Sequence, residues 1–168
     1  MSGQTNLGDA PPQLALRRAF SLFPTGVVAV CALVDDAPVG IAVNSFTSVS
    51  LDPPLVAVCV ARTSNTWPIL AGRTRLGMSI LGSHHEVLCR KLASRNLDRF
   101  EDEDWHATEG GAVLMDGAAL WLECEVRASY DGGDHEIVVL EVLQSDLFPD
   151  VTPLVFHQSQ FRGLLTDK

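Results

Sequence analysis

The sequence predicts a mainly β protein, an antiparallel barrel with short helices at its periphery. Six or seven segments are rich in β-branched residues, and only three short segments show helical periodicity. Turns, and not the regular helical crossovers of a doubly wound sheet, join most of these strands. The length of 168 residues fits one domain. We place this domain at residues 14–165, after a flexible polar tail at residues 1–13.

The first elements are a helix and a hairpin. Apolar residues recur at helical spacing within residues 14–23, which predicts an amphipathic helix that Pro24 ends. The valine-rich run at residues 27–34 predicts a strand buried on both faces. An acidic turn at residues 35–38 then leads into a strand at residues 39–43. We therefore expect the two strands to pair as a hairpin.

A polar segment at residues 44–54 follows the hairpin. It is rich in Ser and Thr and ends in two prolines, so we interpret it as a loop before the strand at residues 55–61. A hydroxyl-rich connection between two buried strands is a typical place for a binding site. Ser64 then has the position of an N-cap for a short helix that ends at Gly72.

The middle of the chain predicts one strand and one helix. A strand is expected at residues 76–81, and Ser83 is the candidate N-cap of a helix at residues 84–93. The acidic segment at residues 98–105 is expected to be exposed, because carboxylates are rarely buried without partners.

The last third predicts a long hairpin. Apolar and polar residues alternate through residues 118–130, the pattern of a half-exposed strand. The sequence Asp-Gly-Gly-Asp at residues 131–134 has hairpin-turn chemistry, and residues 135–147 form the returning strand. A final short strand is expected at residues 153–157.

Charge is unevenly distributed along the chain. The net charge of −9 argues against nonspecific nucleic-acid binding. Residues 1–97 carry five acidic and eight basic side chains, whereas residues 98–168 carry 16 and four. A cluster of bases could bind an anionic small molecule or could simply form the solvated faces of two short helices. Its members are Arg62, Arg73, Arg75, Arg90, Lys91 and Arg95.

The cysteines and the N-terminal segment predict a cytoplasmic protein. The four cysteines stand about thirty residues apart without a Cys-x-x-Cys motif, so we expect buried apolar thiols in a reducing compartment. Residues 1–13 lack a signal-peptide pattern, and no apolar run approaches the roughly 18 residues of a membrane span.

Several common catalytic motifs are missing from the sequence. There is no phosphate-binding P-loop, no Gly-x-Gly-x-x-Gly fingerprint and no Gly-x-Ser-x-Gly nucleophile motif. The pair His85-Glu86 is not followed by the second histidine of a metalloprotease, and the five histidines are too scattered to indicate a metal site.

Two polar clusters remain as candidate binding sites. The hydroxyl-rich segment 44–50 offers neutral donors suited to a flat heteroaromatic ring, or its hydroxyls satisfy their own backbone. Ser64, Asn65 and Thr66 at a helix N-terminus favour a phosphate, with charge from Arg62 or the bases at 90–91, or they only cap the helix. His135 is either an exposed turn residue or a group held over a ligand.

Three motifs resemble one family, the short-chain flavin reductases. The motifs are Phe-Pro-Thr-Gly-Val-Val at residues 23–28, the block at residues 44–55 and Gly-Asp-His at residues 133–135. They occur in the order and at the spacing of this family, and the resemblance covers about residues 14–164. Within this family, the sequence is similar to reductases of actinomycete polyketide and aromatic-oxidation pathways. The resemblance implies a homodimer of six-stranded split barrels with FMN, or transiently FAD, at the subunit interface.

The resemblance also implies the site residues. His135 would face the nicotinamide as the candidate catalytic residue, and Phe100 would close over the flavin. A C-terminal pair, Phe161-Arg162, matches an aromatic-arginine pair of the family. The remaining implied flavin contacts are Thr25, Asn44, Ser45, Phe46, Thr47, Ser48, Val49, Ser50, Ala61, Ser64, Asn65, Thr66, Arg90 and Lys91.

The resemblance implies an NAD(P)H-dependent flavin reductase, with NADH preferred over NADPH, that supplies reduced FMN or FAD to a partner monooxygenase. One alternative keeps the fold but makes the protein an electron carrier or a substrate-specific oxidoreductase with tightly bound FMN. A second alternative is a non-enzymatic module whose acidic C-terminal part docks a basic partner.

Overall fold

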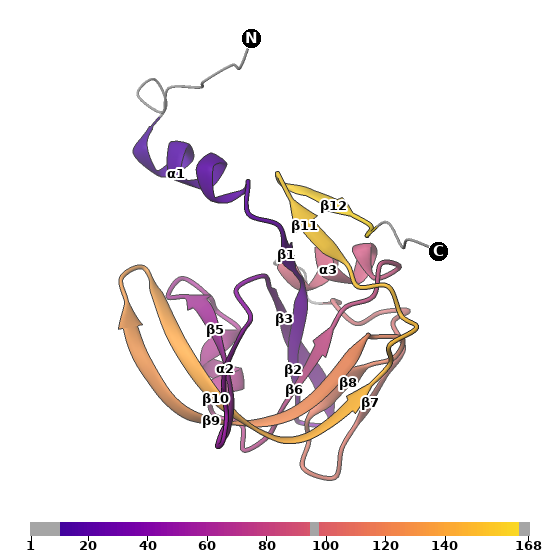
Figure 1. The fold of residues 1–168 in the computed structure, drawn as a ribbon. Helices are drawn as coiled ribbons and strands as arrows, with labels where there is room; N and C mark the ends of the chain where they lie inside the picture. Colours follow the sequence, from indigo (N-terminus) through magenta and orange to yellow (C-terminus); the bar gives the residue numbers. More distant parts are fainter. Residues whose placement is uncertain (1–10, 95–97, 165–168) are drawn as a thin grey trace.

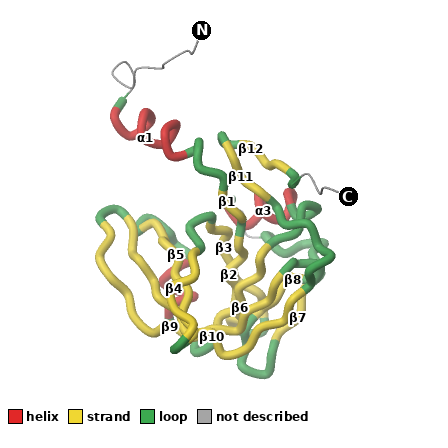
Figure 2. The backbone as a smooth tube through the Cα atoms, in the orientation of Figure 1, coloured by secondary structure: helices red, strands yellow, loops and turns green. Residues whose placement is uncertain are grey.

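A curled antiparallel sheet forms the body of the molecule in a computed structural model, which describes residues 11–94 and 98–164 (Figure 1). Seven strands pair in the order β3-β2-β6-β9-β10-β5-β4. A three-stranded sheet, β1-β11-β12, and the two-stranded β7-β8 accompany it. Figure 2 shows how strands dominate and how few helices there are. The mainly β prediction is therefore confirmed.

The elements that the sequence predicts lie close to their expected places, and further short strands accompany them. In chain order they are α1 (Pro12–Phe20), β1 (Thr25–Gly26), β2 (Val28–Val34), β3 (Ala37–Val43), β4 (Thr47–Leu51), β5 (Pro54–Ala61), α2 (Trp67–Ala71), β6 (Leu76–Ile80), α3 (Glu86–Ala93), β7 (Trp105–Ala107), β8 (Val113–Met115), β9 (Leu120–Gly132), β10 (His135–Leu147), β11 (Val155–His157) and β12 (Gln160–Arg162).

Strand β2 is buried on both faces, as its valine-rich sequence predicts. Val28 and Val30 face a core inside the curled sheet together with β5, β6, β9 and β10. Ala29 and Cys31 face a second core beneath α3, β8 and Leu154. Alternate residues of one strand thus join two cores, which follows from the two-residue period of a strand.

Two predicted hairpins are confirmed. Asp35 and Asp36 have φ angles of 50° and 64° in the turn between β2 and β3, a backbone that a two-residue hairpin turn requires. The long strands β9 and β10 pair from His135↔Gly132 to Leu147↔Leu120, and Gly133 with φ +78° makes their turn. This second turn places His135 at the start of β10.

The segment 44–54, which the sequence analysis interprets as a loop, contains a strand. Residues 47–51 form β4 and pair with β5, so the main sheet has seven strands and not six. Because β4 is an edge strand with Thr47, Ser48 and Val49 exposed, it needs no apolar face. Because its sequence is rich in Ser and Thr and lacks an apolar face, the sequence pattern does not predict this strand.

Four further strands were not predicted, and one of them is the two-residue β1, which pairs with β11. The hairpin of β7 and β8 is built from three-residue strands, and β12 returns against β11. Strands of this length are too short for alternation to be detected in a sequence. Gly77 allows β8 to cross β6, because a Cβ at this glycine would lie 2.0 Å from the carbonyl oxygen of Val113.

The helices begin differently from the expectation. α1 begins at Pro12, so the predicted tail shortens, and residues 1–10 lie outside the described residues. Ser64 Oγ accepts the backbone N–H of Trp67 at 3.1 Å, as an N-cap side chain does, although Thr66 is the cap residue. His85, and not Ser83, precedes α3.

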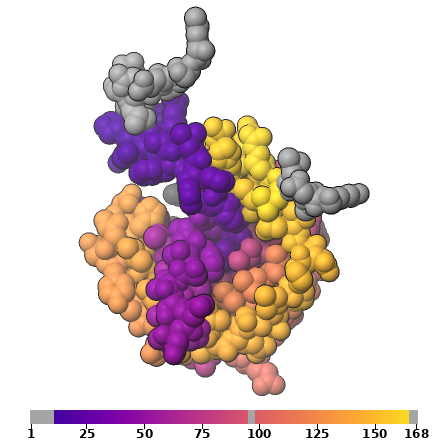
Figure 3. Space-filling model, in the orientation of Figure 1, coloured from indigo at the N-terminus to yellow at the C-terminus, as the bar shows by residue number. Residues whose placement is uncertain are grey.

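α1 projects from the body of the molecule (Figures 1 and 3). Only Ala15 of this helix is buried, and the side chains of Leu16 and Phe20 are 49% and 71% exposed. The predicted amphipathic helix is thus present, but its apolar stripe is uncovered in a single chain. No helix in residues 11–94 and 98–164 is long and apolar enough to cross a membrane.

All four cysteines are free thiols. Cys31, Cys89 and Cys124 are buried, and burial raises the pKa of Cys89 to about 11 and that of Cys124 to about 12. The expectation of apolar thiols is confirmed for these three. Cys59 is only half-buried, because it faces the cavity described next.

Candidate functional site

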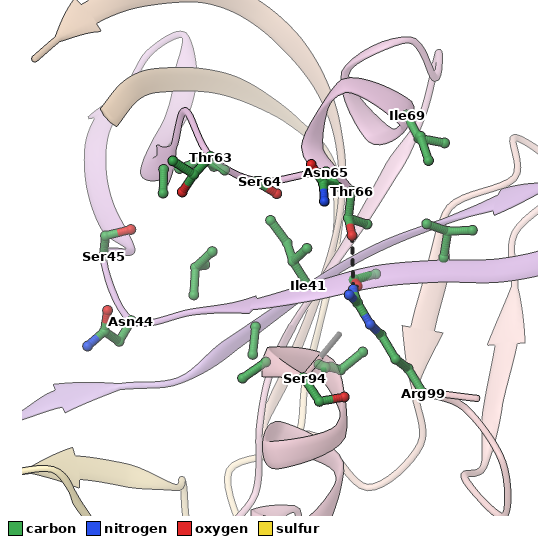
Figure 4. Close-up of a pocket in the computed structure, with 18 of the residues that line it drawn as sticks. Ile41, Asn44, Ser45, Thr63, Ser64, Asn65, Thr66, Ile69, Ser94 and Arg99 are labelled. Atoms are coloured by element: carbon green, nitrogen blue, oxygen red, sulfur yellow. Dashed lines mark hydrogen bonds between the residues drawn. The ribbon is translucent and has the colours of Figure 1, made fainter. Parts of the chain in front are cut away.

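A cavity of about 700 Å³ opens where the curled sheet does not close. It lies between edge strand β3 and strand β5, with α2 and the C-terminal end of α3 beside it (Figure 4). His135 also lines it. This volume lies in the usual range for small-molecule sites. The lining residues are 38–45, 59–61, 63–66, Ile69, 92–94, Arg99, Phe100 and His135.

The floor of the cavity depends on a glycine. A Cβ at Gly40 would lie 2.4 Å from Cys31 Sγ and 2.9 Å from Phe100 Cζ. The absence of a side chain at Gly40 therefore lets the ring of Phe100 lie directly against β3. Phe100 is packed against the second core, so its position at the cavity is fixed by that contact.

Ser45 fastens the start of the 44–50 segment to the wall. Its Oγ donates to the carbonyl oxygen of Cys59 at 2.9 Å and accepts the N–H of the same residue at 2.8 Å. The hydroxyl thereby satisfies backbone groups, which is one of the two roles left open by the sequence. Ser45 consequently shapes the cavity, and neighbouring Asn44 lies at the same end (Figure 4).

A single arginine lies at the opposite end of the cavity. Arg99 Nη1 donates to the carbonyl oxygen of Gly40 at 2.8 Å and to Thr66 Oγ1 at 3.0 Å, joining β3 to the segment before α2 (Figure 4). Within the described residues no carboxylate pairs with Arg99, and none of the lining residues is Asp or Glu. The cavity is therefore suited to an anion, although the chain as a whole carries −9.

His135 is held at the cavity by its neighbour. Its Nδ1 lies 2.7 Å from Asp134 Oδ1, so the carboxylate keeps a proton on Nδ1. The hydrogen bond from His135 holds the pKa of Asp134 below its ordinary value. Because Nδ1 is engaged in this way, Nε2 is the ring nitrogen left for a ligand.

Half of the site residues expected from the resemblance meet at this cavity. The eight that line it are Asn44, Ser45, Ala61, Ser64, Asn65, Thr66, Phe100 and His135. The other eight do not line it, and their contact with a ligand stays a prediction. These are Thr25, Phe46, Thr47, Ser48, Val49, Ser50, Arg90 and Lys91.

Two of the eight residues that do not line the cavity are basic, and both have partners elsewhere in the protein. Arg90 pairs with Glu86 at 2.8 Å on the surface of α3 and lies over the ring of Phe161 at 4.9 Å. Lys91 pairs with Glu103 at 2.7 Å, and this contact raises the pKa of Lys91. Their charges are therefore used within the protein. Arg95 lies outside the described residues.

Thr25 differs from the others because its hydroxyl group makes no hydrogen bond within the described residues. Thr25 pairs with Phe156 across β1 and β11, and its Oγ1 is buried without a hydrogen-bond partner in the described part of the chain. Phe46 packs against the inner core, while residues 47–49 are exposed on β4.

Some residues line the cavity although the sequence does not single them out, among them Arg99, Thr63 and residues 38–43 of edge strand β3. Arg99 stands in an acidic segment, where an ion pair with a neighbouring carboxylate is the ordinary expectation. Its position directly before Phe100 was the available signal. The backbone of β3 contributes because an edge strand leaves N–H and C=O groups unpaired, and residue type does not reveal this.

The chain is similar to known proteins over most of its length. Residues 20–165 match the family model "Flavin reductase like domain". The chain is 37% identical over 147 residues to the FMN reductase (NADH) SmoA of Agrobacterium fabrum, covering 88% of this chain and 83% of the relative. It is 30% identical over 152 residues to the flavin-dependent monooxygenase reductase subunit HsaB of Rhodococcus jostii, covering 90% and 78%.

A solved structure agrees over the whole chain. It is the Streptomyces globisporus C-1027 NADH:FAD oxidoreductase SgcE6 in complex with NAD and FAD fragments, with a TM-score of 0.89. Its sequence is 35% identical, and the match covers 99% of both chains. The match to the family model spans most of this sequence, and the structural match covers nearly all of it. The chain therefore belongs to the flavin reductase-like family.

Proposed function

We propose that this protein is an NADH-dependent flavin reductase that reduces FMN or FAD for a partner monooxygenase. The observation that carries the proposal is the cavity itself, which has neutral polar groups at one end, apolar residues between, and at the other end Arg99, which has no ion pair within the described residues. Family membership and the names of the relatives SmoA, HsaB and SgcE6 support the same activity.

The residues present fit a flavin. The apolar wall around Ile41 and Phe100 suits a flat ring system, and Asn44 offers amide hydrogen-bonding groups near its edge. The hydroxyls of Thr63, Ser64 and Thr66 and the cation of Arg99 suit a ribityl chain and phosphate. Figure 4 shows Asn44 and Thr66 on opposite sides of Ile41, as an elongated ligand requires.

The protein contributes orientation more than acid-base chemistry. A bound flavin supplies the hydride-accepting ring and a nicotinamide nucleotide supplies the hydride, so the reaction belongs to the cofactors. The cavity must hold the two rings about 3–3.5 Å apart, and exclude water between them. His135, fixed through Nδ1, orients the nicotinamide and is not an obligatory general acid.

A homodimer with a reducing, cytoplasmic location completes the proposal. The uncovered apolar residues of α1, among them Leu16 and Phe20, form a stripe that a second copy can cover. Four free thiols accord with a reducing compartment.

Absorbance at the nicotinamide band tests the activity. We expect NADH oxidation whose rate rises with added FMN or FAD, and a slower rate with NADPH. His135→Ala should raise the KM for NADH and retain most of kcat at saturating NADH. If the protein binds flavin but does not oxidise NADH, the electron-carrier alternative is favoured. If it oxidises NADH at a rate that does not depend on added flavin, an oxidoreductase with tightly bound FMN is favoured. Loss of all activity in His135→Ala at saturating NADH would contradict the orienting role.

A further inference from the structure

We propose that Arg62 is a positioning residue that acts on the reaction through His135, although Arg62 itself does not line the cavity. This inference rests on the proposed function, because it assigns a role in nicotinamide binding. The sequence offered Arg62 as a source of charge for a phosphate. The structure gives its guanidinium a different task at the turn between β9 and β10.

The guanidinium of Arg62 bonds the tip of that turn and the strand before it. Nε donates to the carbonyl oxygen of Gly133 at 3.0 Å, and Nη2 donates to the carboxylate of Asp131. The backbone N–H of Arg62 donates to the carbonyl oxygen of Asp134 at 3.0 Å. Arg62, which follows β5, thus forms hydrogen bonds to Asp131 before the turn and to Gly133 and Asp134 within it.

Strand pairing holds the base of the turn, where His135 lies opposite Gly132 of β9 and Ala61 of β5, but little packs against the tip. A Cβ at Gly133 would meet no atom within 4 Å, so the tip of the turn stands in open space. The side chains of Asp131 and Asp134 are 82% and 93% exposed. Because packing does not restrain these residues, hydrogen bonds must, and Arg62 supplies those at the tip.

The restraint passes directly to the candidate catalytic residue. Asp134 follows Gly133, whose carbonyl oxygen the guanidinium holds, and fixes the imidazole of His135 through Nδ1 at 2.7 Å; the bond from the backbone N–H of Arg62 to the Asp134 carbonyl oxygen does not depend on the side chain at residue 62. On the far side of His135, Glu136 accepts the indole N–H of Trp67 at 2.9 Å. His135 therefore lies between two anchors, and Arg62 forms the one nearer the turn.

The fork of an arginine is needed at this place. A lysine could pair with Asp131, but its single ammonium group does not match two acceptors in a planar fork. Arg127 offers a matched control, since it is also an exposed arginine of this hairpin, paired with Glu141 at 3.0 Å, and it does not line the cavity.

Steady-state kinetics with NADH and saturating flavin test the proposal. Arg62→Ala should raise the KM for NADH by roughly three- to tenfold, as the loss of one or two modest hydrogen bonds implies, with kcat and flavin affinity unchanged. Arg62→Lys should recover little of this effect, and Arg127→Ala should behave as the wild type.

A double variant shows whether Arg62 works through His135. In a His135→Ala background, Arg62→Ala should have no further effect, because the group that it positions is gone. Equal effects in both backgrounds, or an unchanged KM in Arg62→Ala, would overturn the proposal.

Nitrogen-15 NMR of the imidazole separates this inference from the proposed function, since it requires no turnover. The wild type should show His135 with its proton on Nδ1, and Arg62→Ala should average the two tautomers. If NADH oxidation is absent while this NMR change occurs, the proposed function fails and the positioning contact stands. An NMR signal that Arg62→Ala leaves unchanged refutes the contact whatever the activity.

Discussion

Three arginines that the sequence does not distinguish make different interactions in the folded protein. Arg90 is used in a surface pair with Glu86, Arg62 holds a turn, and Arg99 presents its charge to the cavity. Exposed pairs such as that of Arg90 contribute little stability, whereas a cation at a cavity that no Asp or Glu lines can bind an anion strongly. The partners of each guanidinium, and not its place in a basic stretch, therefore decide its role.

Arg99→Ala should weaken FMN binding by about 10- to 100-fold, the equivalent of about 1.5–3 kcal/mol for a hydrogen bond to a charged group. The same substitution should leave the affinity for riboflavin, which has no phosphate, nearly unchanged. Flavin fluorescence titrations measure both constants, and Arg90→Ala serves as the control. Equal weakening of FMN and riboflavin would mean that Arg99 only joins Gly40 and Thr66.

At the scale of elements, α3 links a buried histidine to the cavity. His85 precedes this helix, and its C-terminal residues 92–94 line the cavity. Nδ1 of His85 accepts the N–H of Gly82 at 3.1 Å, and Nε2 donates to the carbonyl oxygen of Asp116 at 2.9 Å. This pattern requires a neutral imidazole. Burial, and then the neighbouring His84, lower the pKa of His85.

The folded state should therefore lose stability in mild acid. As the pH falls below about 6.5, His85 is protonated in the unfolded chain before it is protonated in the folded protein. The free energy of unfolding therefore decreases as the pH falls, until the pH is below the lowered pKa of His85 in the folded protein. Urea unfolding at several pH values, in the wild type and His85→Gln, measures this. The pH dependence should be shallower in His85→Gln, and identical curves for the two proteins would contradict the assignment.

At the scale of the whole molecule, one helix stands apart from the rest. The seven-stranded sheet encloses one core and shares β2 with a second, but α1 buries little beyond Ala15. An amphipathic helix without a partner is costly to expose, and a symmetric dimer is the commonest way to cover such a face.

In the proposed homodimer, Phe20→Glu should shift the molar mass toward that of a monomer, because it places a carboxylate in the apolar stripe of α1. Phe20→Leu keeps an apolar side chain there and should retain the molar mass of the wild type. Light scattering coupled to size-exclusion chromatography measures the molar mass of each variant. A wild type that is monomeric, or a Phe20→Glu variant with the mass of the wild type, would count against α1 as the interface.

The sequence by itself determined the mainly β fold, the two hairpins and the family. Local patterns suffice for these, since alternation at β9, the continuous apolar run of β2 and the turn residues at 35–36 and 133 act over a few neighbouring positions. Half of the expected site residues also met at one cavity, because the 44–45 and 64–66 clusters follow strands that the fold brings together.

Only the tertiary structure decided the rest. Strand β4 is stabilised by pairing with β5, so its polar sequence could not reveal it. The roles of Arg62, Arg90 and Arg99 depend on partners 71, four and 33 residues away in the chain. Hydrogen bonds and charges act through space, and the folding of the sheet sets those distances. The sequence could therefore supply the residues of the site, but only the folded chain could assign their duties.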